Sequence, residues 1–96
     1  MATFISLINF TDQGILNVKE SPDRYEAFKA LAEKLGGTVK GVYYTMGRYD
    51  MVVIVEASDE AAMIAMLKVG SIGNVRTEPL RGFTFEEMKK IIGKMP

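Results

Sequence analysis

The sequence predicts one α+β domain whose elements follow one another in the order β-α-β-β-α-β. Three observations support this fold class. Residues that favour extended structure are concentrated in four strand-sized runs, 2–10, 38–46, 51–57 and 72–80. Helix-start signals at Ser21 and Ser58 open two segments between these runs. The length of 96 residues suits a single core, so we expect one domain over residues 1–96.

The first strand is expected over residues 2–10, where the apolar residues are interrupted mainly by Ser6 and Asn9. Because apolar and polar residues do not alternate strictly, both faces of this strand are expected to be covered. The polar segment from Thr11 to Gly14 is typical of a turn.

The first helix is expected to begin at Ser21-Pro22-Asp23, with serine as the N-cap, proline at the first helical position and an acid in the first turn. Spacings of three and four residues then place one apolar stripe along the helix, formed by Tyr25, Phe28, Leu31, Ala32 and Leu35. Gly36-Gly37 is typical of a left-handed helix end.

The second and third strands are expected to form a hairpin. Thr38 to Met46 favours extended structure, and Gly47 to Asp50 turns the chain back into the third strand, Met51 to Ala57. The turn is expected to require a positive φ at Gly47, which glycine adopts without steric cost.

The second helix is expected to run from an N-cap at Ser58 to about Val69, where Gly70 ends it. Its methionine and alanine residues are expected to fill the core, because methionine adapts to irregular gaps, and not to bind a metal. A fourth strand is expected from Ile72 to Leu80.

This order of elements is the split βαβ pattern of a ferredoxin-like sandwich, with an antiparallel sheet in the strand order 4-1-3-2. The first and third strands, which are the most apolar, then lie in the middle. Two helices can cover only one face of such a sheet, and the other face still carries apolar residues. We therefore expect a homo-oligomer, at least a dimer, of the dimeric α/β-barrel type.

Residues 82–96 are expected to form a helical tail. Thr84 and Glu87 have the spacing of a capping box, and Phe83 and Met88 have the spacing of a hydrophobic staple. A helix this short is marginal alone, so we expect it to dock, preferably across an interface. Its apolar stripe consists of Phe85, Met88, Ile91, Ile92 and Met95.

The composition restricts the possible functions. Lys plus Arg and Asp plus Glu are both 12, and a net charge of zero argues against binding to nucleic acid or to an anionic membrane. No signal peptide or membrane-spanning stretch is visible, and the absence of cysteine fits a reducing cytoplasm, where we expect the protein. The absence of histidine removes the commonest general base and metal ligand, so no metal is expected. Haem would also lack a histidine or cysteine axial ligand, and no cofactor is expected.

Gly47-Arg48-Tyr49-Asp50, followed by an apolar strand that ends in Glu56, resembles the motif of the GYD-domain family. The stretch from Gly73 to Arg81 is similar to the fourth strand of that family, and Gly14 with Ser21-Pro22-x-Arg24 is similar to its early segment. The resemblance covers nearly the whole chain. It implies a small ferredoxin-like protein related to dimeric α/β-barrel proteins, and it implies no particular activity.

The predicted topology brings several polar residues to one end of the sheet, where the first strand ends and the hairpin turns. Arginine, tyrosine and amide groups at the mouth of an apolar cleft suit a small anionic or carbonyl-bearing ligand, and a buried Asp50 could act as a base. With Arg24 nearby, the candidate ligand-binding residues are Asn9, Arg48, Tyr49, Asp50, Asn74 and Arg76.

A structural role for these residues competes with that interpretation. Asp50 is expected to accept hydrogen bonds from backbone N–H groups or to pair with an arginine, while Tyr49 packs its ring. Glu56 is expected to form an ion pair with Lys40 or Arg76.

Three functions remain open. An oligomeric small-molecule-binding or sensing domain is the first expectation. By analogy of fold alone, a cofactor-independent monooxygenase or isomerase is the second, and a structural or assembly protein is the third. A hydrolase triad is excluded because no histidine is present to activate a serine.

Overall fold

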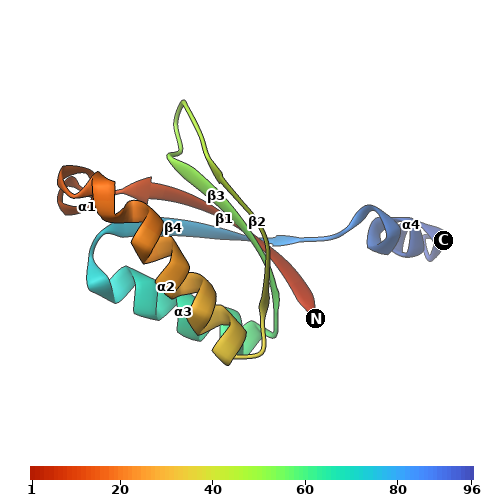
Figure 1. Ribbon diagram of the computed structural model, residues 1–96. Coiled ribbons are helices and arrows are strands. Elements are labelled where there is room, and N and C mark those ends of the chain that lie inside the picture. Colours follow the sequence, from red (N-terminus) through yellow and green to blue (C-terminus); the bar gives the residue numbers. More distant parts are fainter.

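The computed structural model describes all residues, 1–96. Its centre is an antiparallel sheet of four strands, β1 (Ala2–Phe10), β2 (Thr38–Tyr44), β3 (Met51–Ala57) and β4 (Val75–Gly82). The strands lie in the order β2-β3-β1-β4 (Figure 1). This is the predicted order 4-1-3-2 counted from the opposite edge, so the prediction of an α+β domain with this sheet is confirmed.

Two helices, α2 (Ser21–Lys34) and α3 (Asp59–Ile72), cover one face of the sheet (Figure 1). The short helix α1 (Asp12–Leu16) and the 3-10 turn η1 (Val18–Glu20) connect β1 to α2. The core lies between these helices and the sheet, and alternate residues of β3 point into it. Its buried apolar residues are Ile8, Met51, Val53, Val55, Ala57 and Ala61.

The methionine residues of α3 fill the core only in part. The sulfur of Met66 lies 3.7 Å from the hydroxyl of Ser6, a side chain that is only 1% exposed. Met63, by contrast, is 59% exposed on the outer side of the helix. The prediction of a methionine-filled core therefore holds for Met66 and is wrong for Met63.

The connection from β1 to α2 differs from the prediction. The segment from Thr11 to Gly14 is not a simple turn, because Thr11 is the N-cap of α1 and its hydroxyl accepts a hydrogen bond from the Gly14 N–H at 3.1 Å. Ser21 is not the N-cap of α2, since η1 runs directly into the helix and Glu20 takes that position. The buried Ser21 hydroxyl forms a hydrogen bond of 2.8 Å with the hydroxyl of Tyr44, which satisfies it.

The end of α3 also differs from the prediction. Ser58 caps the start of the helix through its hydroxyl, as expected. Gly70 lies within the helix, which continues to Ile72 and ends at Gly73 with a φ of 90°. Because this left-handed conformation favours glycine, Gly73 is the physical stop, and β4 begins only at Val75.

The second face of the sheet carries no helix, and we call it the open face (Figure 1). The strand register and the alternation of side chains place Ile5, Leu7, Val52 and Ile54 at its centre. Leu80, at its β4 edge, is 43% exposed. The sequence prediction of an apolar face without a helical cover is confirmed.

The helix α4 (Phe85–Gly93) lies apart from the domain, beyond the end of β4 (Figure 1). The predicted capping box is confirmed, since Thr84 accepts a hydrogen bond from the Glu87 N–H at 3.1 Å and Glu87 accepts one from the Thr84 N–H at 2.8 Å. The latter hydrogen bond lowers the pKa of Glu87. None of the helices combines the length and the apolar character needed to cross a membrane.

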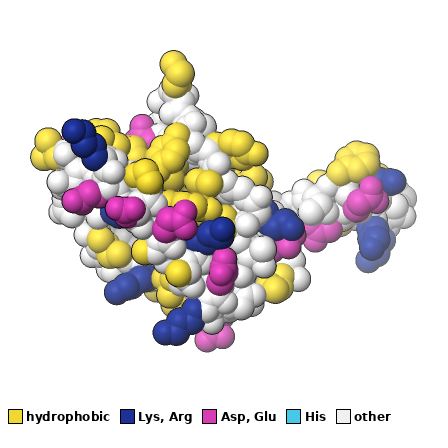
Figure 2. Space-filling model, viewed as in Figure 1, with side chains coloured by type: hydrophobic (Ala, Val, Ile, Leu, Met, Phe, Trp, Pro, Cys, Tyr) yellow, Lys and Arg dark blue, Asp and Glu magenta, His cyan; other side chains and the backbone are white.

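No hydrogen bond or ion pair joins α4 to the sheet or to the other helices. Its apolar side chains gather on one side and its charged ones lie around them (Figure 2). Phe85 is 76% exposed, Ile92 56% and Met95 69%, so the apolar stripe of α4 faces solvent. The helix is therefore formed but undocked within the single chain.

Candidate functional site

Polar side chains gather at the end of the open face next to the β2–β3 hairpin. Arg48 donates a hydrogen bond to the Tyr49 hydroxyl at 3.2 Å, and that hydroxyl donates to the Glu78 carboxylate at 3.4 Å. Since Glu78 is on β4 and Tyr49 precedes β3, the tyrosine side chain spans β1, the strand between them. The hydrogen bond to the Tyr49 hydroxyl raises the pKa of the Arg48 guanidinium.

Asn9 and Arg76 lie at the same end of the open face. They are opposite each other in the ladder between β1 and β4, and Arg76 shares its face with Glu78 two residues later. Four of the six predicted site residues, Asn9, Arg48, Tyr49 and Arg76, are therefore neighbours. We call these four the polar end.

Asp50 makes structural contacts. Its Oδ2 accepts a hydrogen bond from the Phe10 N–H at 2.8 Å, and its own N–H donates to the carbonyl of Ile8 at 2.9 Å. The Asp50 carbonyl also accepts from the Thr45 N–H at 2.9 Å, which closes the hairpin. The prediction that Asp50 accepts hydrogen bonds from the backbone is confirmed, and no arginine pairs with it.

Asn74 lies on the helix-covered side, in the connection between α3 and β4. Its carbonyl accepts a hydrogen bond from the Thr11 N–H at 3.0 Å, and its Oδ1 accepts one from Nε2 of Gln13 at 3.0 Å. The structure therefore does not bring Asn74 together with the polar end.

The predicted ion pair of Glu56 is wrong, because neither Lys40 nor Arg76 reaches it. The register explains the failure for Arg76. Glu56 lies opposite Thr3 near the start of β1, whereas Arg76 lies opposite Asn9 near its end. No group of three or more His, Cys, Asp or Glu side chains is placed to hold a metal ion.

A cavity of about 290 Å³ lies between α2 and α3 on the helix-covered side. Ile8 and Met51 from the sheet, Phe28 from α2 and Val69 from α3 line it. A volume of this order, bounded largely by apolar side chains, is at the small end of the range for ligand sites. Of the six predicted site residues, only Asn74 lines this cavity.

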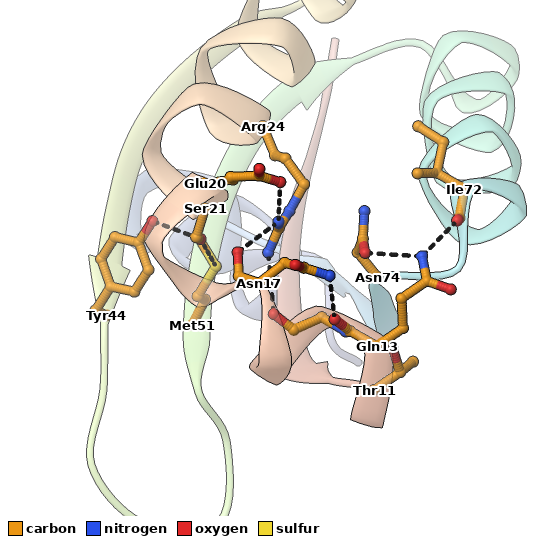
Figure 3. A network of polar contacts seen from close by, with 11 residues as sticks. Thr11, Gln13, Asn17, Glu20, Ser21, Arg24, Tyr44, Met51, Ile72 and Asn74 are labelled. Carbon is orange, nitrogen blue, oxygen red and sulfur yellow. Dashed lines mark hydrogen bonds and ion pairs between the residues drawn. The ribbon is translucent and has the colours of Figure 1, made fainter.

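Ser21, Arg24 and Lys68 also line the cavity. Arg24 donates hydrogen bonds to the carbonyl of Asn17 at 3.0 Å and to that of Gly14 at 3.4 Å, which hold its guanidinium beside α1 (Figure 3). The segment from Ser21 to Arg24 has a recognisable pattern and could have indicated this site. Lys68 has no such signal, because an isolated helical lysine is usually only solvated.

Known proteins resemble this chain over most of its length. The family model of the GYD domain matches residues 4–92. The chain belongs to the GYD-domain family. A relative from Thermus thermophilus, named "Glutamine synthetase and cystathionine beta-lyase binding protein", is 36% identical over 90 residues, which are 92% of this chain and 95% of the relative.

A crystal structure of a protein from Thermus thermophilus is also similar to this GYD-domain protein. The two share 28% sequence identity with a TM-score of 0.51, over 88% of this chain and 95% of the other. The family match through residue 92 includes most of α4, so these residues belong to the GYD domain and not to an unrelated extension.

The GYD motif residues lie in the β2–β3 hairpin and its surroundings. Gly47 adopts a φ of 110°, as predicted for the turn, and β2 ends at Tyr44, before the predicted end at Met46. Met46 is fully exposed at the hairpin, whose tip is apolar in Figure 2. In this GYD-domain protein, glycine shapes the turn and Asp50 joins it to β1, so both have architectural roles.

Proposed function

We propose that this GYD-domain protein is a self-associating binding module that docks onto other proteins. The observation that carries the proposal is that the open face and the α4 stripe are both apolar and have no cover within the chain. Apolar surfaces of this kind mark interaction sites. The relative whose name describes binding to two enzymes supports the same function. Asp50, the predicted base, is engaged with the backbone, which favours binding over catalysis.

In this proposal the open face packs against the open face of a second copy, as in a dimeric α/β barrel. Glu56 and Arg76 lie at opposite ends of the face, so a two-fold axis can place Glu56 of one copy near Arg76 of the other. The net charge of zero adds no general repulsion between copies. The polar end then forms the rim of the interface, where Arg48 can bind a small anion.

Ile54→Glu is expected to convert the dimer into a monomer, because the two-fold axis brings two carboxylates into the centre of the interface. Light scattering coupled to size-exclusion chromatography at micromolar concentration measures the change. Leu67→Glu is the matched control, since Leu67 is 66% exposed on α3, and it should remain dimeric. A monomeric wild-type protein, or dissociation of both variants, would contradict the proposed interface.

In this proposal α4 binds a groove on a partner enzyme as an amphipathic helix. Phe85, Met88, Ile92 and Met95 recur at spacings of three and four residues, which is the pattern of helix-in-groove recognition. A nine-residue helix is marginal alone, so docking would also stabilise it. Glutamine synthetase and cystathionine β-lyase, the enzymes in the name of the relative, are the partners to test.

The double variant Phe85→Ser/Ile92→Ser is expected to weaken binding to such an enzyme by more than about a hundredfold, because each lost apolar side chain removes about 1.5–3 kcal/mol of burial. Surface plasmon resonance with purified glutamine synthetase and cystathionine β-lyase measures the affinity. Lys90→Ser, which lies outside the apolar stripe of α4, is the control and should bind like the wild type. The role of α4 is refuted if neither enzyme binds the wild type, or if the double variant changes only the oligomeric state.

A further inference from the structure

The cavity between α2 and α3 combines an apolar interior with hydrogen-bond donors at its polar side. The interior includes Ile8, Phe28, Leu31, Met51 and Val69, which offer no polar side-chain group. Such a space binds the apolar body of a ligand by excluding water from it. The head group of the ligand is then selected by the polar residues that line the same cavity.

The orientation of Asn74 follows from its neighbours. Gln13 donates from Nε2 to the carbonyl of Ile72 at 3.4 Å, and a carbonyl can only accept. The same Nε2 therefore donates to Asn74, which must present its Oδ1 to Gln13 at 3.0 Å. The amide nitrogen of Asn74 consequently points away from Gln13, into the space between α2 and α3 (Figure 3). Two N–H donors of Asn74 remain free there.

Two cationic side chains, Arg24 and Lys68, line the cavity together with Asn74. Arg24 uses two of its five N–H donors on the carbonyls of Gly14 and Asn17, which leaves three. Its only carboxylate neighbour, Glu20, is 3.9 Å away with a side chain that is 73% exposed, so this pair neutralises it weakly. Lys68 forms no ion pair, and no aspartate or glutamate lines the cavity.

We propose that this cavity binds a small carboxylate with an apolar body, such as a medium-chain alkanoate. The carboxylate accepts hydrogen bonds from Arg24, Asn74 and Lys68, and the alkyl chain lies between α2 and α3. Charged donors and the absence of lining carboxylates favour an anion over a neutral ligand of the same size. The site lies on the side of the sheet opposite the open face, so it goes beyond the proposed docking function and does not depend on it.

Isothermal titration calorimetry of the full chain with octanoate and with octan-1-ol tests the proposal. These probes share the alkyl chain and differ in charge. Octanoate is expected to bind once per chain and at least about tenfold more tightly than octanol, because hydrogen bonds to a charged head group are stronger than those to a neutral hydroxyl. Absence of saturable octanoate binding, or equal binding of both probes, would overturn the proposal.

Two pairs of variants locate the binding site. Ala27 lines the cavity, so Ala27→Leu is expected to fill it and abolish octanoate binding, whereas Ala30→Leu on the same helix should have no effect. Lys68→Gln should weaken the binding of octanoate but not that of octanol. Lys29 lies outside the cavity, so Lys29→Gln should leave the binding of both probes unchanged. Binding that survives Ala27→Leu at wild-type strength would place the ligand elsewhere and refute the site.

Discussion

Gly14→Ala is expected to lower the free energy of unfolding by about 3 kcal/mol, at the upper end for overpacking. A Cβ at residue 14 would lie 1.9 Å from the carbonyl oxygen of Asn74 and 2.8 Å from its carbonyl carbon. These are backbone atoms, so no side chain can rotate away to relieve the clash. The same backbone accepts the hydrogen bond from the Thr11 N–H, and α1 must separate from the α3–β4 connection to make room.

The measurement is thermal or urea unfolding followed by circular dichroism, and a loss of this size lowers Tm by more than about 10 °C. Gly70→Ala is the matched control, because it lies within α3 and a Cβ there meets nothing within 4 Å. It should stabilise the protein by about 0.5–1 kcal/mol through helix propensity. A Gly14→Ala protein as stable as the wild type would show that α1 does not pack closely against Asn74.

Asp50→Ala is expected to cost about 2 kcal/mol of stability. The Asp50 carboxylate accepts the Phe10 N–H at 2.8 Å, and hydrogen bonds to charged groups contribute about 1.5–3 kcal/mol. Without the carboxylate, the partly buried N–H of Phe10 at the end of β1 has no hydrogen-bond acceptor. The neighbouring hydrogen bond from the Asp50 N–H to the Ile8 carbonyl, which joins the hairpin to β1, is also weakened. Chemical unfolding measures the loss directly.

Asp50→Asn separates charge from geometry at this position. An asparagine oxygen can still accept from the Phe10 N–H, so about half of the loss should be recovered. Glu26→Ala, an exposed acid of α2 without a hydrogen bond or ion pair, should leave stability unchanged. If Asp50→Ala unfolds at the wild-type denaturant concentration, the aspartate of the GYD motif has no structural role.

The local signals in the sequence predicted most of the fold. Ser58 and Thr84 cap their helices as expected, because the cap hydroxyl and its acceptor site lie within three residues. Ser21 has the same local signal but does not cap α2, because η1 runs directly into the helix. Its hydroxyl forms a hydrogen bond with the hydroxyl of Tyr44 on β2 instead. Gly70 and Gly73 offered two possible helix ends, and the backbone takes the positive φ only at Gly73.

The candidate site could be predicted only in part. Topology correctly placed Asn9, Arg48, Tyr49 and Arg76 at one end of the sheet. Topology could not determine on which face of the sheet each side chain lies. The prediction therefore groups Asn74, which lies on the helix-covered side, with residues of the open face. Asn74 and Arg76 are two residues apart and would share a face if both were in the strand, but β4 begins only at Val75, and Asn74 lies in the connection that follows the helix stop at Gly73.

The sequence by itself determined the order of the four strands, the two covering helices and α4, the turn at Gly47, the capping box of α4 and the presence of an apolar face without a cover, but not α1 and η1. These features depend on interactions within a few residues or on the period of the apolar pattern. Only the tertiary structure decided that Gly14 packs against the backbone of Asn74 and that Arg24 and Lys68 share a cavity. Such contacts join segments far apart in the chain, so they depend on how α1, α2 and α3 pack, which no local pattern encodes.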